Sequence, residues 1–113
     1  MNKNKYNIQS ILEAIDKIEG YIKPFNNAKD FYNHTLTFEA TMMNFIIIAQ
    51  MVDRLSDDFK ENYHEINWTK IKSLRNIIAH DYLGINIEEI WQIITIHLVT
   101  LKHNLNDILL HLD

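Results

Sequence analysis

A long run of apolar residues at helical spacing, near the end of the chain, most constrains what this sequence can fold into. The run steps alternately by four and three residues through Ile87, Trp91, Ile94, Leu98, Leu101, Leu105, Ile108 and Leu112. Such spacing is typical of the buried seam of a helix in a bundle or coiled coil. Only two Gly and one Pro occur among the 113 residues, so few turn signals interrupt long helices. The sequence therefore predicts an all-α fold.

Three more helices are predicted from the spacing of apolar residues. The first carries one stripe, Ile8, Ile11, Leu12, Ile15, Ile18 and Ile22, and ends before Pro24. Residues 24–36 are predicted to be a connection with one short helical turn around residues 30–32. The second helix is expected from Thr37 to Phe59. The third is expected to begin near Asn67, a suitable N-cap, and to close at Gly84 after burying Trp68, Ile71, Leu74 and Ile78.

The start of the last helix has the clearest local signal in the chain. Asn86 is followed three residues later by Glu89, which resembles a capping box, and Ile85 and Ile90 have the spacing of a hydrophobic staple. This pattern predicts that the helix starts at Ile87.

The second helix is apolar on two sides. One stripe contains Phe45, Ile48, Ala49, Val52, Leu55 and Phe59, and the other contains Phe38, Met42, Met43, Ile46, Ile47 and Met51. A helix of this kind lies either at the centre of its bundle or against another subunit. In a chain this short, we favour a face shared between two copies in a dimer.

Charge is unevenly distributed along the chain. The formal net charge is −4, which argues against a protein that coats nucleic acid by bulk electrostatics. Residues 53–65 hold five acids against two bases, whereas residues 68–80 hold Lys70, Lys72 and Arg75 and no acid. We expect a polyanion to meet the second segment.

Several classes of protein and site are disfavoured. Cysteine is absent, the first residues lack the apolar stretch of a secretory signal, and the run from Phe45 to Val52 is shorter than a bilayer span. A cytoplasmic protein is the expectation. The histidines show no paired-ligand spacing and no Gly-rich phosphate loop occurs, so we predict no metal site and no cofactor.

The stretch RNIIAHDY, residues 75–82, combines the side chains needed to work on phosphate. On a helix, Lys72, Asn76 and His80 align at steps of four residues, and a long Arg75 side chain can reach across to the histidine. Imidazole transfers protons near neutral pH, and guanidinium grips phosphate oxygens. From spacing alone, an ion-paired Arg75 and a surface His80 are the more common outcome. Tyr82 alone fits the rim of a core, and the three basic residues fit a solvated face.

The same residues resemble a known motif. Arg75-Asn76, three residues, His80, one residue, Tyr82 resembles the motif of the HEPN superfamily, in which Arg is followed after four to six residues by His, and the added Tyr resembles the HepT-like branch. Three longer stretches, ILEAIDKIEGYI, RLSDDFKENYHEINWTKIKSLRN and HDYLGINIEEIWQIITIHLVTLK, are also similar to that family. The resemblance covers most of the chain and implies one HEPN domain over residues 1–113.

The resemblance implies an antiparallel four- to five-helix bundle that forms a homodimer, with the motif helices of two subunits lining a cleft. It further implies a metal-independent endoribonuclease that leaves a 2′,3′-cyclic phosphate, with Arg75, Asn76 and His80 in the catalytic site. Lys70 and Lys72 are candidate RNA contacts. Tyr82 matches the tyrosine to which a partner minimal nucleotidyltransferase adds AMP. The implied protein is the toxin of a type VII-like toxin–antitoxin pair.

Two departures from the family pattern keep other hypotheses open. Ala49-Gln50 stands where relatives often have Gly-Glu, and Asn67 stands where a Pro often precedes the Trp. If the family glutamate assists the active site or the tyrosine modification, Gln50 alters that assistance, although it can equally act as a neutral hydrogen-bonding substitute. One alternative is a non-catalytic module that binds a separate nucleotidyltransferase. Another is a purely structural helical dimer.

Overall fold

Every regular element that the computed structural model describes is a helix, which confirms the predicted all-α class. The structure describes residues 3–76, 78–79 and 86–112. The elements in chain order are α1 (Lys3–Ile22), α2 (Ala28–Asn33), α3 (Thr35–Asp53), α4 (Asp57–Asn62), α5 (Trp68–Lys72), α7 (Ile87–Gln92), the π-helix η1 (Ile93–His97) and α8 (Leu98–Leu109). Residues 74–76 and 78–79 are helical as well.

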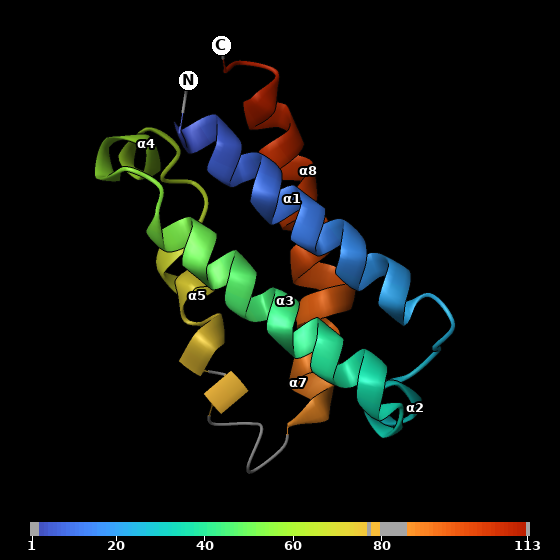
Figure 1. Cartoon of the computed structure of the whole chain (residues 1–113). Coiled ribbons are helices and arrows are strands. Elements are labelled where there is room, and N and C mark those ends of the chain that lie inside the picture. Colours follow the sequence, from blue (N-terminus) through green and yellow to red (C-terminus); the bar gives the residue numbers. More distant parts are fainter. Residues whose placement is uncertain (1–2, 77, 80–85, 113) are drawn as a thin grey trace.

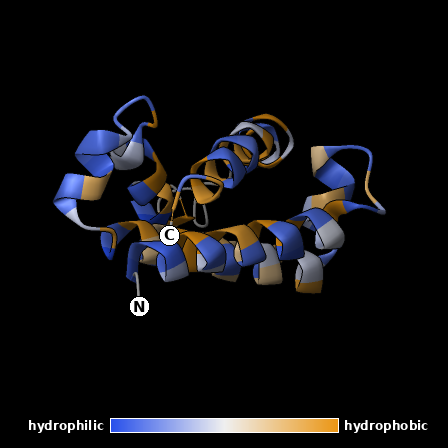
Figure 2. Ribbon diagram, turned by 90° about the horizontal axis from the view of Figure 1, so that it is seen from above, coloured by the Kyte–Doolittle hydropathy of each residue, from blue (hydrophilic) through white to orange (hydrophobic). Residues whose placement is uncertain are grey.

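The long helices form two layers. α1 and α3 lie side by side and run in opposite directions, and they share the most extensive contact in the described structure (Figure 1). α5 packs on α3, α8 packs on α1, and the short α2 contacts both α3 and α7. Viewed from above, α4 and α8 lie on one side of the α1–α3 layer (Figure 2). The arrangement is compatible with the predicted helical bundle.

The apolar stripe of α1 packs into the core as predicted. Ile8, Ile11, Ile15 and Ile18 are fully buried. Gly20 lies on the exposed side near the end of this helix, and a Cβ atom there would meet nothing within 4 Å. Packing therefore does not require a glycine at this position.

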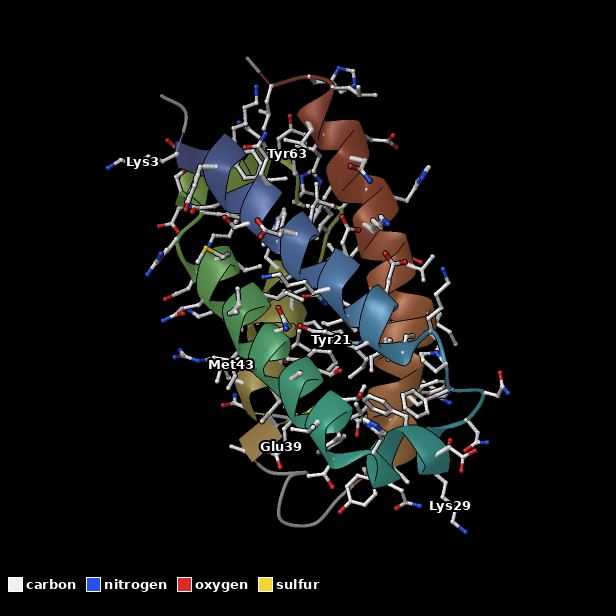
Figure 3. The ribbon with its side chains drawn as sticks, turned by 45° about the vertical axis from the view of Figure 1, so that its right-hand side comes forward. Lys3, Tyr21, Lys29, Glu39, Met43 and Tyr63 are labelled. Carbon is white, nitrogen blue, oxygen red and sulfur yellow. The ribbon has the colours of Figure 1, made fainter. Side chains whose placement is uncertain are left out.

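α3 is the central helix, and its first predicted stripe is buried. Among the second stripe, Phe38 and Met42 are also buried, whereas Met43 is 58% exposed. Met43 projects from the side of α3 that faces away from α8 (Figure 3). The half-buried residues Ile46, Ile47 and Met51 complete that stripe. Part of the apolar surface that we expected at a dimer face is therefore buried within a single copy of the chain.

α3 is also the one helix among the described residues that is long and apolar enough to cross a membrane by length and composition. Core helices pass the same test, and α3 contacts α1, α2 and α5. Its hydropathy is accounted for by this central position in the bundle.

The prediction that the second helix continues to Phe59 is wrong. α3 ends at Asp53, and Ser56 starts the separate helix α4 by accepting a hydrogen bond at Oγ from the Phe59 N–H, 3.2 Å away. The first helix stabilises this break. The Asn4 side chain accepts from the Ser56 N–H at 3.0 Å, and Asn7 donates to the Arg54 carbonyl at 3.3 Å. The chain therefore turns at residues 54–56, where side chains of α1 form hydrogen bonds with backbone groups. In a continuous helix these groups would pair within the helix.

The third predicted helix starts as expected but is divided. The Asn67 side chain caps α5 by accepting from the Lys70 N–H at 3.0 Å, and Trp68, Leu74 and Ile78 are buried, while Ile71 is half-buried. α5 ends at Lys72, and Ser73 forms a turn in which its Oγ donates to the Lys70 carbonyl. Helix then resumes at residue 74. Gly84 lies outside the described residues.

The last helix begins at Ile87, as the capping pattern predicted. The Asn86 side chain accepts from the Glu89 N–H at 3.1 Å, and its Nδ2 donates to the Glu89 carboxylate at 3.3 Å. The predicted seam faces the core, with Ile94, Leu98, Leu101, Leu105 and Ile108 all buried. The π-helical turn at residues 93–97 was not predicted, and within it both Ile93 and Ile94 are buried. Ile85, the other half of the expected staple, lies outside the described residues.

Candidate functional site

The structure describes half of the predicted catalytic motif. Arg75 and Asn76 are helical and exposed. His80 and Tyr82 lie outside the described residues, and so does the predicted approach of Arg75 to His80. The neighbours of the described pair explain its orientation: Leu74 and Ile78 are 5% and 9% exposed and anchor this helix in the core. Arg75 and Asn76 follow directly after the first of these anchors and are exposed to solvent.

Lys72, a candidate RNA contact, is paired with an acid of the neighbouring helix. Its Nζ lies 2.7 Å from Oδ1 of Asp53, the last residue of α3, and both side chains are about half exposed. This hydrogen bond from Lys72, together with its charge, lowers the pKa of Asp53, and the charges of Lys60 and Arg75 act in the same direction. Three cations, Lys72, Lys60 and Arg75, therefore favour the charged form of this one carboxylate.

Lys70, the other candidate RNA contact, belongs to a different surface. It lines a groove of about 290 Å³ that separates the segment around α5 from η1 and α8. The floor of the groove is apolar, and its lining residues include Ile66, Ile71, Leu74, Leu98 and Leu101, with His97 and Asn104 among the polar ones. The structure thus divides the basic trio of the sequence into Lys72 and Arg75 on the α3 side and Lys70 on the α8 side.

The family of this chain follows from comparison with known proteins. A family model described as "Ribonuclease HepT-like" matches residues 11–108, which include all of the motif from Arg75 to Tyr82. The chain belongs to this family. The resemblance to HepT-like proteins that the motif indicated is therefore confirmed.

Curated relatives agree with the family match. A protein of Methanocaldococcus jannaschii named "Gamma-glutamylcyclotransferase and putative RNase" is 28% identical over 96% of this chain and 49% of its own length. A "Putative RNase" of Caldanaerobacter subterraneus is 27% identical over 72% of each chain. A "Probable ribonuclease HepT" of Thermococcus cleftensis is 26% identical over 84% of this chain and 86% of its own. The HepT-like chain thus spans about half of the first relative. No solved structure matches it significantly.

Of the residues that depart from the HepT-like pattern, Ala49 and Gln50 occupy different environments. Ala49 is 1% exposed, so its methyl group packs in the core, whereas Gln50 is exposed. The acid that does reach the motif-bearing segment is Asp53, three residues after Gln50. In the sequence, Asp53 is recognisable only as part of an acidic segment. Its position one helical turn from Gln50 was the signal that could have singled it out, because residues at that spacing share a helix face.

Three of the histidines in the described part of the HepT-like chain make local contacts. His34 Nδ1 accepts from the Thr37 N–H at 3.4 Å as the cap of α3, and His64 Nδ1 lies 3.1 Å from the Glu61 carbonyl. His103 Nε2 lies 3.5 Å from Asp107. Within the described ranges, no group of three His, Asp or Glu side chains is arranged to hold a metal ion.

Proposed function

We propose that this chain is a metal-independent endoribonuclease, acting in the cytoplasm as the toxin of a type VII-like toxin–antitoxin pair. The observation that carries the proposal is the HepT-like family match, which includes the whole motif. The described half of the motif supports it, because Arg75 and Asn76 are exposed and the exposed Lys72 lies one helical turn before them. Such a surface attracts the phosphates of RNA.

In the proposed reaction, the imidazole of His80 takes the proton of a ribose 2′-hydroxyl, and the 2′-oxygen attacks the adjacent phosphorus. The bond from phosphorus to the 5′-oxygen breaks, and a second imidazole, from His80 of the other copy, protonates that oxygen. The products are a 2′,3′-cyclic phosphate and a 5′-hydroxyl. Arg75 stabilises the charge that develops on the phosphate oxygens, and Asn76 orients the imidazole or the phosphate.

A homodimer is part of the proposal because the two histidines must meet at one phosphate. The surface that supports it is the outer side of α3, where exposed Met43 lies next to half-buried Ile46, Ile47 and Met51. Burying these apolar side chains against a second copy is favourable. A cleft lined by two motif helices would also concentrate the positive charge that the chain as a whole lacks.

The products test the enzymatic proposal. Purified protein should cut single-stranded RNA in the presence of EDTA, and the upstream fragments should end in 2′,3′-cyclic phosphates, detectable by mass spectrometry. A matched RNA with 2′-deoxyribose at the cut positions should stay intact there, because the attacking nucleophile is missing. Cutting that needs a divalent metal, or that continues on the deoxy substrate, would contradict the mechanism.

Neutralisation by a partner is the second element of the proposal. A cognate minimal nucleotidyltransferase adds AMP to the Tyr82 hydroxyl, which places bulk and negative charge beside the phosphate site and excludes RNA. Co-expression with that partner should relieve growth arrest by the wild-type chain but not by Tyr82→Phe, which lacks the acceptor oxygen. Tyr63→Phe is the matched control, since Tyr63 packs against Phe59 with ring centroids 4.9 Å apart. It should be neutralised like the wild type. Equal relief of Tyr82→Phe would assign the modification elsewhere.

The alternative, a non-catalytic module that binds the nucleotidyltransferase, is favoured by one observation. Gln50 stands where relatives often have Glu, so a carboxylate that assists the active site is absent from that position. A purified dimer that binds the transferase and leaves every RNA intact would support this alternative over the nuclease.

A further inference from the structure

The ion pair between Asp53 and Lys72 joins the ends of two helices directly beside the motif. Asp53 is the last residue of α3 and Lys72 the last of α5, and the next turn after Lys72 carries Arg75 and Asn76. Lys72 Nζ is 2.7 Å from the Asp53 carboxylate, with side-chain exposures of 54% and 52%. Lys60 and Arg75 are also close enough to favour the charged form of that carboxylate.

Stability does not explain this arrangement well. Exposed ion pairs contribute little to the free energy of folding, because both charges are well solvated and two flexible side chains must be ordered. α3 and α5 also pack together and both contribute to the apolar core, since Val52 and Trp68 are 1% and 7% exposed. The pair is therefore free to open at low cost.

The Asp53 carboxylate is chemically similar to a phosphate group of the proposed RNA substrate. A carboxylate oxygen surrounded by one bound lysine and two further cations occupies the same kind of environment as a phosphate oxygen of RNA. A bound RNA strand and Asp53 would compete for the same ammonium group. While Asp53 holds Lys72, that lysine contributes no net charge to RNA binding.

We propose that Asp53 is a built-in counter-ion that occupies the place of an RNA phosphate at Lys72 and weakens the affinity of the motif surface for RNA. Binding of RNA displaces it, and Lys72 passes from the carboxylate to the phosphate. The inference rests on the proposed ribonuclease function and adds to it a residue that limits non-specific binding of polyanions.

The test measures binding apart from cleavage. All chains carry His80→Ala, so that the RNA is not cut, and the affinity for a short fluorescent single-stranded RNA is measured by anisotropy over a series of salt concentrations. Asp53→Asn should raise the affinity roughly three- to tenfold at low salt, because one nearby negative charge is removed. It should also steepen the plot of log affinity against log salt, because in the wild type the displaced Asp53 carboxylate takes up a cation from solution and offsets part of the counter-ion release from RNA.

Asp16→Asn is the matched control. Asp16 also pairs with a lysine, the half-buried Lys102, at 3.0 Å, but on the face shared by α1 and α8. The substitution changes the net charge by the same amount as Asp53→Asn. It should leave both affinity and salt dependence nearly unchanged.

A double-mutant cycle shows whether Asp53 acts through its lysine. With Lys72→Ala already present, Asp53→Asn should lose most of its effect on affinity and all of its effect on the salt slope. Weaker or unchanged RNA binding by Asp53→Asn would overturn the counter-ion role and leave the nuclease proposal standing. A wild-type surface that binds no RNA at any salt concentration would overturn both.

Discussion

Alanine at Arg75 or at His80 should each lower the rate of RNA cleavage by about 10²–10⁴-fold, the usual effect of losing a general acid–base or a group that stabilises transition-state charge. For Arg75 the loss should come from chemistry and not from folding, because its side chain is exposed and the flanking Leu74 and Ile78 supply the packing. Arg75→Lys should fall between the wild type and Arg75→Ala, since it keeps the charge but loses the two-pronged grip on phosphate.

Two substitutions elsewhere make suitable controls for this measurement. Lys29→Ala removes an exposed cation from α2, at the far end of the molecule from the termini (Figure 3). His103→Ala removes an exposed imidazole from α8 that lies near Asp107. Both variants should cleave at the wild-type rate in single-turnover assays, and circular dichroism should show all variants folded. Cleavage by Arg75→Ala or His80→Ala at the wild-type rate would refute the roles assigned to them.

Alanine at Phe31 should lower the free energy of unfolding by about 3–5 kcal/mol, as large-to-small substitutions of core aromatic residues do. Phe31 is fully buried, and its ring centroid lies 5.6 Å from that of Phe38 on α3 and 5.6 Å from that of Trp91 on α7. The short α2 depends on these contacts to join the two helices. The expected loss is a large part of the stability of a domain of this size.

Urea denaturation at one fixed protein concentration measures this effect. Leu36→Ala is the control, because Leu36 lies five residues away and is 81% exposed. It should change the free energy of unfolding by no more than about 0.5 kcal/mol. Phe31→Leu should cost less than Phe31→Ala, since it fills most of the cavity. Equal stability of Phe31→Ala and Leu36→Ala would mean that the aromatic cluster does not hold α2 in place.

Local sequence patterns were sufficient to predict most of the helices. The caps at Asn67 and Asn86 form with residues only three positions away, so their hydrogen bonds depend on nothing distant. The buried stripes of α1 and α8 follow from periodicity, because an apolar face must be removed from water whatever it packs against. The candidate site is less determined by spacing, because on a helix Arg75 lies only about 60° from the buried Ile78, close to the apolar face.

Residues far apart in the sequence decided the rest. The long second helix breaks after Asp53 because Asn4 and Asn7 of α1 bond to Ser56 and Arg54, 52 and 47 residues away. The spacing of apolar residues within this segment gives no information about those partners. The same is true of the candidate site: Asp53 meets Lys72 only because α3 and α5 pack together, which also leaves Lys70 facing α8. A helical pattern determines which side chains share a face, whereas the partner that each face meets depends on how the whole chain packs.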